Sequence, residues 1–127
     1  METKRDYISG PISGLEPEKA KENFDRVEKL LTESGFRVFN PLKNGLPFDA
    51  DTHQHMRRDL NILTNEDDPF DYIFMMKRWA HSGGCKLELD TAIACGIQVV
   101  FEESDLFCLN SDFLKTVKHS YTAIEFS

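Results

Sequence analysis

The chain has 127 residues, of which 40% are hydrophobic and 29% charged, so we expect one globular domain with a real hydrophobic core. Its net charge is −7 and it has no basic cluster, which excludes most duplex-binding proteins because nothing would neutralise the phosphates, although a free nucleoside or nucleotide could still bind. The three cysteines form no Cys-x-x-Cys pair, and no apolar run is long enough for a signal peptide or a membrane span, so we expect reduced thiols and a cytoplasmic protein without a membrane partner.

The first third of the chain predicts a strand, a glycine loop and an amphipathic helix. Tyr7, Ile8 and Ser9 end the first strand, and a loop with the sequence GPISG breaks it at residues 10–14. Proline and acidic residues favour a helix start at about residue 17, and apolar side chains follow at helical spacing. Gly35 is expected to end this helix.

A second strand and a second helix are predicted next. Residues 36–40 form a compact strand that ends before Pro41, and a loop rich in Pro, Gly, Asn and Asp follows it. Asp51 or Thr52 can cap the next helix, which we expect over about residues 52–64. The chain therefore repeats its opening order of strand and helix.

The same order continues to residue 101. An acidic loop at residues 65–69 is expected to be solvated surface, and the continuous apolar run at residues 72–76 is typical of a buried parallel strand. A loop at residues 77–84 leads to a helix of about ten residues that ends at Gly96, and residues 97–101 form a fourth strand.

This alternation predicts a single-domain α/β protein of flavodoxin-like (Rossmann-like) topology, with a parallel sheet and helices on both faces. The last part of the chain is less regular. A short helix after Asn110 or Ser111 and an edge strand at residues 121–124 are the elements expected there.

Two acidic residues lie where helical spacing would place apolar side chains. Asp59 is on the same inward stripe of its predicted helix as Met56, and Glu88 is on the same stripe as Ala92. A carboxylate that faces inward is costly unless it is hydrogen-bonded, paired or functional. Two partly buried carboxylates near the glycine turn at residues 82–84 are what glycosyl-transfer chemistry requires.

The predicted topology brings several candidate residues to one edge of the sheet. Ligands bind beyond the carboxyl ends of the strands in such folds, and the loops at residues 9–14, 40–51 and 77–84 all leave those ends. Asp59 would reach this edge from the second helix. The other residues expected to meet there are Tyr7, Ser9, Gly10, Asn40, Trp79, Ser82, Gly84 and Glu88.

Motifs in a fixed order extend over residues 6–101. They are YISGPISG at residues 7–14, GFRVFNP at residues 35–41, the pair Met56 and Asp59, W-x-x-S-x-G at residues 79–84, and E-x-x-x-A-x-x-x-G at residues 88–96. This set resembles the nucleoside 2-deoxyribosyltransferase superfamily, which includes the 2′-deoxynucleoside 5′-phosphate N-hydrolases. Within it, the chain is most similar to an uncharacterised bacterial and phage branch. Residues 102–127 have no counterpart that we can assign.

The resemblance implies a covalent mechanism. Glu88 would attack the anomeric carbon and form a sugar ester, Asp59 would protonate the departing base or organise the site, and Tyr7 would orient Glu88. The residues expected to bind the substrate are Ser9, Gly10, Pro11, Asn40, Trp79, Ser82 and Gly84. The resemblance implies no metal or organic cofactor, and it implies a homodimer because relatives complete their sites across an interface.

Elementary chemistry supports these roles. Breaking an N-glycosidic bond builds positive charge on the sugar, which a nearby carboxylate stabilises, and the departing base needs a proton from a second acid. We place Glu88 in the first turn of its helix, where the helix dipole would keep it ionised. Ser82 and the glycines before that helix leave backbone N–H groups that could bind an anion.

The sequence also departs from the family pattern. The N-hydrolases carry an arginine after the first glycine loop, whereas residues 12–15 contain none, and the loop at residues 64–70 is longer than usual. Deoxynucleosides and their 5′-monophosphates, and hydrolysis and transfer, therefore remain alternatives. A non-catalytic nucleotide-binding or sensor module, or a structural dimer with a vestigial site, would use the same fold.

Some residues have simpler explanations. Glu88 could merely cap backbone N–H groups, and Asp59 could be solvated or pair with a neighbouring arginine. His53 and His55 lack the additional ligands that a zinc site needs, so we expect them to be exposed. Cys85 is a weak alternative nucleophile.

Overall fold

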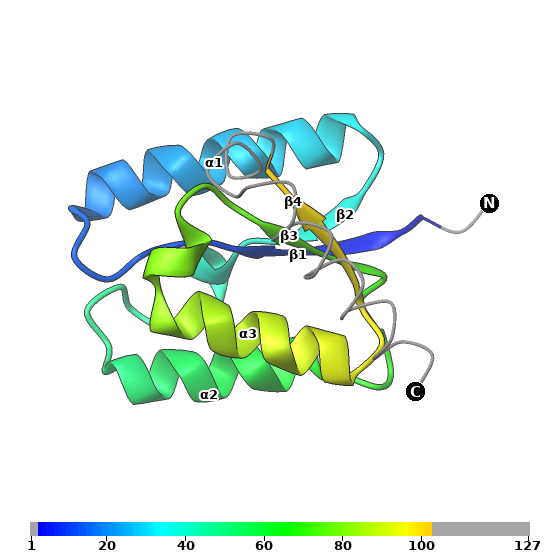
Figure 1. Ribbon diagram of the computed structural model, residues 1–127. Coiled ribbons are helices and arrows are strands. Elements are labelled where there is room, and N and C mark those ends of the chain that lie inside the picture. Colours follow the sequence, from blue (N-terminus) through cyan, green and yellow to red (C-terminus); the bar gives the residue numbers. More distant parts are fainter. Residues whose placement is uncertain (1–2, 103–127) are drawn as a thin grey trace, which may run out of the picture.

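The computed structural model describes residues 3–102 (Figure 1). Four parallel strands form a sheet in the order β2-β1-β3-β4. The strands are β1 (Arg5–Ser9), β2 (Arg37–Phe39), β3 (Tyr72–Met75) and β4 (Gln98–Phe101). The predicted parallel sheet is confirmed, and its order is that of the first four strands in flavodoxin-like proteins.

Helices cover both faces of the sheet, as predicted. α1 (Pro17–Glu33) lies on one face, and α2 (Thr52–Leu63) and α3 (Gly83–Ala94) pack against each other on the opposite face (Figure 1). Two 3₁₀ turns that the sequence did not predict, η1 (Pro41–Lys43) and η2 (Trp79–His81), lie in the connections after β2 and β3. The predicted α/β fold class is therefore confirmed.

Side-chain caps fix the starts of α2 and α3. The Asp51 carboxylate accepts a hydrogen bond from the His53 amide at 3.0 Å, and the Gln54 side chain accepts one from the Asp51 amide at 3.1 Å, so α2 opens with a capping box. At α3 the Ser82 hydroxyl accepts a hydrogen bond from the Cys85 amide at 3.2 Å. Both caps lie at the edge of the sheet where a site was predicted.

The central strand β1 divides its side chains between the two layers. Tyr7 is part of the core under α2 and α3, whereas Ile8 is part of the core under α1. Because side chains alternate along a strand, Ser9 faces the same layer as Tyr7, and Asp6 faces the same layer as Ile8. This alternation directs two hydroxyl groups toward α3.

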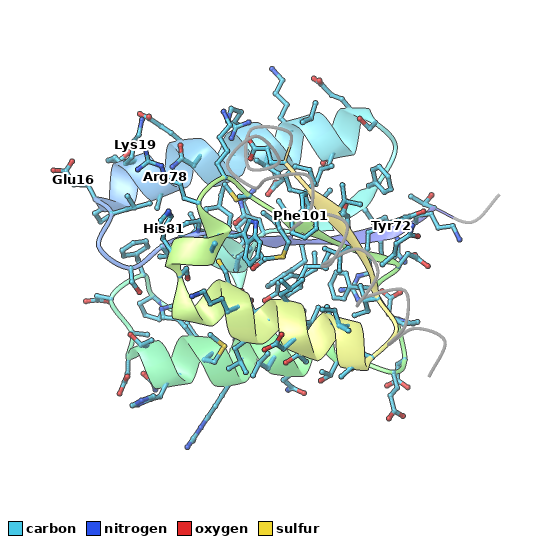
Figure 2. All side chains as sticks on the ribbon, in the orientation of Figure 1. Glu16, Lys19, Tyr72, Arg78, His81 and Phe101 are labelled. Atoms are coloured by element: carbon cyan, nitrogen blue, oxygen red, sulfur yellow. The ribbon has the colours of Figure 1, made fainter. Side chains whose placement is uncertain are left out.

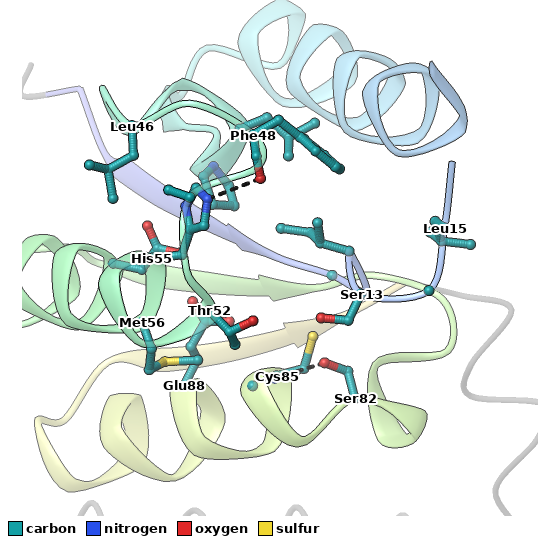
Figure 3. Close-up of a pocket in the computed structure, with 18 of the residues that line it drawn as sticks. Ser13, Leu15, Leu46, Phe48, Thr52, His55, Met56, Ser82, Cys85 and Glu88 are labelled. Carbon is teal, nitrogen blue, oxygen red and sulfur yellow. Dashed lines mark hydrogen bonds between the residues drawn. The ribbon is translucent and has the colours of Figure 1, made fainter. Parts of the chain in front are cut away.

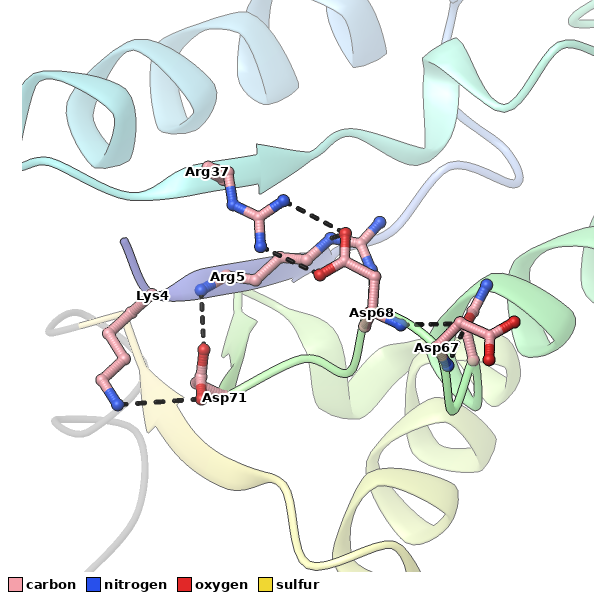
Figure 4. A network of polar contacts seen from close by, with 7 residues as sticks. Lys4, Arg5, Arg37, Asp67, Asp68 and Asp71 are labelled. Carbon is pink, nitrogen blue, oxygen red and sulfur yellow. Dashed lines mark hydrogen bonds and ion pairs between the residues drawn. The ribbon is translucent and has the colours of Figure 1, made fainter. Parts of the chain in front are cut away.

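A polar network lies at the amino ends of the strands, opposite the predicted site, where β1 and β2 begin (Figure 4). The Arg37 guanidinium donates two hydrogen bonds to the Asp68 carboxylate at 2.9 and 3.1 Å, and Arg5 approaches the same carboxylate at 3.6 Å. Lys4 pairs with Asp71 at 3.9 Å. The acidic loop predicted as solvated surface is thus anchored to two strands, although exposed pairs of this kind typically contribute only about 0–1 kcal/mol each.

Asp6 gives the fold a pH-dependent weakness. Its side chain is buried (2% exposed), its Oδ1 atom has no hydrogen-bond partner within residues 3–102, and burial raises its pKa from 3.8 to about 7. The folded state therefore binds a proton that the unfolded state has already released, so this group makes the protein less stable as pH rises from about 4 to about 7.

Asp6→Asn is expected to raise the free energy of unfolding by on the order of 1–3 kcal/mol at pH 8 and to change it little at pH 4, because only the ionised form is penalised. Urea denaturation of the two proteins at both pH values measures this difference. Equal stability of the two proteins at pH 8 would contradict the explanation.

The predicted elements after residue 102, a helix after Asn110 or Ser111 and a strand at residues 121–124, lie outside the described residues. Among the helices of residues 3–102, none combines the length and the apolar character that crossing a membrane requires.

Candidate active site

A cavity of about 360 Å³ opens beyond the carboxyl ends of the strands (Figure 3). Its walls come from the loop after β1, the segment between β2 and α2, and residues of α2 and α3. This volume is in the range of small-molecule sites. The cavity lies at the edge where the sequence placed the site.

Glu88 is held by two hydroxyl groups of β1. The Ser9 hydroxyl donates a hydrogen bond to Glu88 Oε1 at 2.8 Å, and the Tyr7 hydroxyl donates one to Oε2. Both donors are fully buried, and Glu88 itself is only 6% exposed, yet it lines the cavity. The inward orientation predicted for Glu88 is therefore confirmed, and its carboxyl group has a fixed orientation.

The electrostatic prediction for Glu88 is wrong. α3 begins at Gly83, so Glu88 lies in the second turn, and the first turn contains no acidic residue. Burial raises the pKa of Glu88 to about 7, the hydrogen bonds from Tyr7 and Ser9 lower it, and the charge of Asp59 raises it. The protonated and ionised forms are thus both populated near neutral pH.

Asp59 lines the same cavity from α2. It is also 6% exposed, which excludes the solvated alternative, and its Oδ1 atom accepts a hydrogen bond from Asn44 Nδ2 at 2.8 Å. Burial raises the pKa of Asp59, while the Asn44 hydrogen bond and the charges of His55 and Arg58 lower it. Despite the longer loop at residues 64–70, both predicted acids face one cavity.

Asn44 and His55 form a polar connection that the sequence did not reveal. Asn44 Nδ2 lies 3.1 Å from His55 Nδ1, and His55 Nε2 lies 3.2 Å from the Phe48 carbonyl oxygen (Figure 3). His55 was expected to be exposed, but it is partly buried and lines the cavity. The signal available was the Asn44-Gly45 dipeptide, which predicts a turn but not which group the amide contacts.

Three predicted substrate-binding residues line the cavity: Gly10, Ser82 and Gly84. A Cβ atom on Gly10 would come within 2.4 Å of Met76 Sδ, and one on Gly84 within 3.0 Å of Met56 Cε. The glycines therefore let neighbouring side chains approach the backbone closely. Ser82 combines its position on the cavity wall with its role as the cap of α3.

Other predicted substrate-binding residues do not line the cavity. Asn40 donates a hydrogen bond to the Glu28 carboxylate at 3.1 Å. Trp79 packs against Phe101, which is labelled in Figure 2, with 5.5 Å between the ring centroids. Pro11 does not line the cavity, and neither does Ser9, whose hydroxyl instead donates to Glu88. Within the described residues, these positions support the site rather than form its surface.

Comparison with curated proteins and with solved structures gave no match to this chain. A family model described as a domain of unknown function, DUF4406, matches residues 4–101, which include every strand and helix described above. The chain therefore belongs to the DUF4406 family.

Proposed function

We propose that this protein cleaves the N-glycosidic bond of deoxynucleosides, as a hydrolase or a deoxyribosyl transferase, and that it is a divergent relative of the nucleoside 2-deoxyribosyltransferases. The observation that carries the proposal is that two buried carboxyl groups, Glu88 and Asp59, face one cavity. Of these two groups, Glu88 alone has hydroxyl donors at both of its oxygens among residues 3–102, which suits a positioned nucleophile.

The first step forms a sugar ester. An ionised Glu88 oxygen attacks the anomeric carbon, a carbon–oxygen bond forms, and the carbon–nitrogen bond to the base breaks. The electron pair of the broken bond stays on the base nitrogen, and the Asp59 carboxyl supplies the proton that the base needs. Tyr7 keeps its proton throughout, because burial and the charge of Glu88 raise the pKa of Tyr7 well above its ordinary value.

The second step releases the sugar. A water molecule, or a second base in a transfer reaction, attacks the anomeric carbon and breaks the ester, so Glu88 leaves as a carboxylate. Asp59 accepts the proton lost by the attacking group and returns to its acid form. The hydrogen bonds from Tyr7 and Ser9 stabilise the departing carboxylate.

The walls of the cavity favour an uncharged nucleoside. Its apolar surface, which suits the faces of a base, comes from Ile12, Leu15, Leu42, Leu46, Phe48 and Met56. No lysine or arginine of residues 3–102 lines the cavity, whereas Glu88 and Asp59 both do. A 5′-phosphate would therefore meet carboxyl groups without a cationic side chain to offset them.

Incubation with a panel of deoxynucleosides and their 5′-monophosphates tests the function. We expect the protein to release base from at least one deoxynucleoside, and to release it more slowly from the matching monophosphate. Chromatography measures the free base, and an added acceptor base distinguishes transfer from hydrolysis. A panel member that shifts the melting temperature without being cleaved would favour the nucleotide sensor instead.

A further inference from the structure

We infer that Asn44 is the positioning residue for Asp59 and that His55 orients Asn44. This inference rests on the proposed function, in which Asp59 handles the proton of the departing base. It assigns a role to two residues outside the set that the sequence predicted.

The Asn44 amide has one possible orientation. Its Oδ1 atom accepts a hydrogen bond from the Leu46 amide at 3.0 Å, so the oxygen side of the group is fixed by a backbone donor. The nitrogen side then faces Asp59 Oδ1 at 2.8 Å and His55 Nδ1 at 3.1 Å. Each of the two N–H groups has an acceptor, and rotating the amide by half a turn would break all three contacts.

In its neutral form His55 is held in one tautomer. The Phe48 carbonyl oxygen can only accept, so His55 Nε2, which lies 3.2 Å away, carries the hydrogen (Figure 3). His55 Nδ1 is then the acceptor for Asn44. Arg58 adds a further restraint, because its Nη1 atom donates to the backbone oxygen of Asn44 at 2.6 Å. The loop before α2 is thus tied to α2 through both of these side chains.

This arrangement determines which Asp59 oxygen can transfer a proton. Asn44 is itself buried (6% exposed), and its N–H group occupies Asp59 Oδ1. A proton on Oδ1 would point at that N–H group, so the carboxyl proton belongs on Oδ2. Within residues 3–102, Oδ2 has no hydrogen-bond partner, which leaves it available to a base in the cavity.

The titratable and charged groups around Asp59 come from three elements. Arg58 and His55 lie on α2 with it, Glu88 faces it from α3, and Tyr7 approaches from β1. None of the other groups donates a hydrogen bond to Asp59 among the described residues, so the direct contact with Asn44 can be tested on its own.

Asn40 provides a matched control for the substitution of Asn44. Asn40 and Asn44 each accept a hydrogen bond from the amide two residues later, and each donates to a carboxylate, but only Asn44 contacts Asp59. We expect Asn44→Ala to raise the pKa of Asp59, because it removes a donor to the ionised form, whereas Asn40→Ala leaves that pKa unchanged. Carbon-13 NMR titration of carboxyl-labelled protein measures the pKa, with Asp59→Asn identifying the signal.

Further variants separate positioning from folding. Asn44→Asp keeps the turn with Leu46 but replaces the N–H donor with a carboxylate, whose negative charge beside Asp59 should raise the pKa of Asp59 more strongly than Asn44→Ala does. Both His55→Asn and His55→Gln lose the His55 charge that lowers the pKa of Asp59, but His55→Asn can replace the Nδ1 acceptor for Asn44, so it should raise that pKa less than His55→Gln, which replaces only the Nε2 donor. In Asn44→Ala we also expect kcat to fall roughly 10- to 100-fold with little change in KM.

The NMR titration decides the inference even if no substrate is found. An unchanged Asp59 pKa in Asn44→Ala and Asn44→Asp would overturn it, as would an equal shift in Asn40→Ala. A shifted pKa without base release by the wild type would support the contact between Asn44 and Asp59 while removing the proposed reaction.

Discussion

Glu88→Gln is expected to abolish base release, with kcat falling by more than about 10³-fold, because an amide oxygen cannot form the sugar ester. The substitution preserves the size of the side chain, and its carbonyl oxygen can still accept from Ser9 or Tyr7. The loss should therefore reflect the missing nucleophile rather than a collapsed site. Chromatographic assay of base release measures it.

Stability provides the internal control for Glu88→Gln. Because burial raises the pKa of Glu88 from 4.5 to about 7, this group makes the protein less stable as pH rises from about 4.5 to about 7. The variant should thus be more stable than the wild type at pH 8 by roughly 1–3 kcal/mol. Asp90→Asn removes the same charge from an exposed position on α3 and should retain activity. Base release by Glu88→Gln at a rate close to wild type would exclude Glu88 as the nucleophile.

Asp59→Asn is expected to lower kcat by about 10²- to 10⁴-fold, the range typical of a general acid. The new amide oxygen can still accept from Asn44, so the loss would come from the missing proton. The effect should be greatest for bases that leave poorly and smallest for bases that leave readily without protonation. Comparison of kcat for a series of deoxynucleosides with different bases measures this dependence.

The pH profile gives a second test of Asp59. Activity requires ionised Glu88 and protonated Asp59, so the wild-type profile should be bell-shaped. Burial raises the pKa of both carboxyl groups, to about 7 for Glu88. Because the two groups interact, the second of their two protons dissociates only near that pH. The optimum should therefore lie on the acidic side of neutrality. In Asp59→Asn the alkaline limb of the profile should disappear. An unaltered pH profile, together with an equal loss of kcat for every base, would contradict the role of Asp59 as the general acid.

The sequence was sufficient for the fold and for the two acids. The β-α alternation predicted the parallel sheet, and helical spacing placed Asp59 and Glu88 on inward faces, which their burial confirms. Alternation along β1 also places Tyr7 and Ser9 on the side of α3, where they meet Glu88. Periodicity determines which face a side chain occupies, and these contacts need little more than that.

Side-chain direction in the loops could not be predicted in the same way. Topology brought Asn40 and Trp79 to the correct edge of the sheet, but the Asn40 amide turns to Glu28 and Trp79 packs on Phe101. The unpredicted 3₁₀ turns follow or contain these residues, and their geometry sets those directions. The contacts of Asn44 were hidden for the same reason.

The position of Glu88 in its helix was missed because α3 starts earlier than its residues suggest. Gly83 and Gly84 are poor helix formers, so the predicted loop extended through residue 84. The Ser82 cap compensates for them, and the helix begins at Gly83. This shift moves Glu88 out of the first turn, so burial rather than the helix dipole dominates its pKa.

The most direct test of the covalent mechanism is mass spectrometry of the wild-type protein after reaction with a deoxynucleoside that carries fluorine at C2′, which slows hydrolysis of a sugar ester by disfavouring positive charge on the ring. The mechanism predicts a protein heavier by one sugar residue, released base in equal amount, and an adduct on Glu88 in the digested protein. Base release from this nucleoside with the protein at its unmodified mass, or an adduct on a peptide without Glu88, would contradict it.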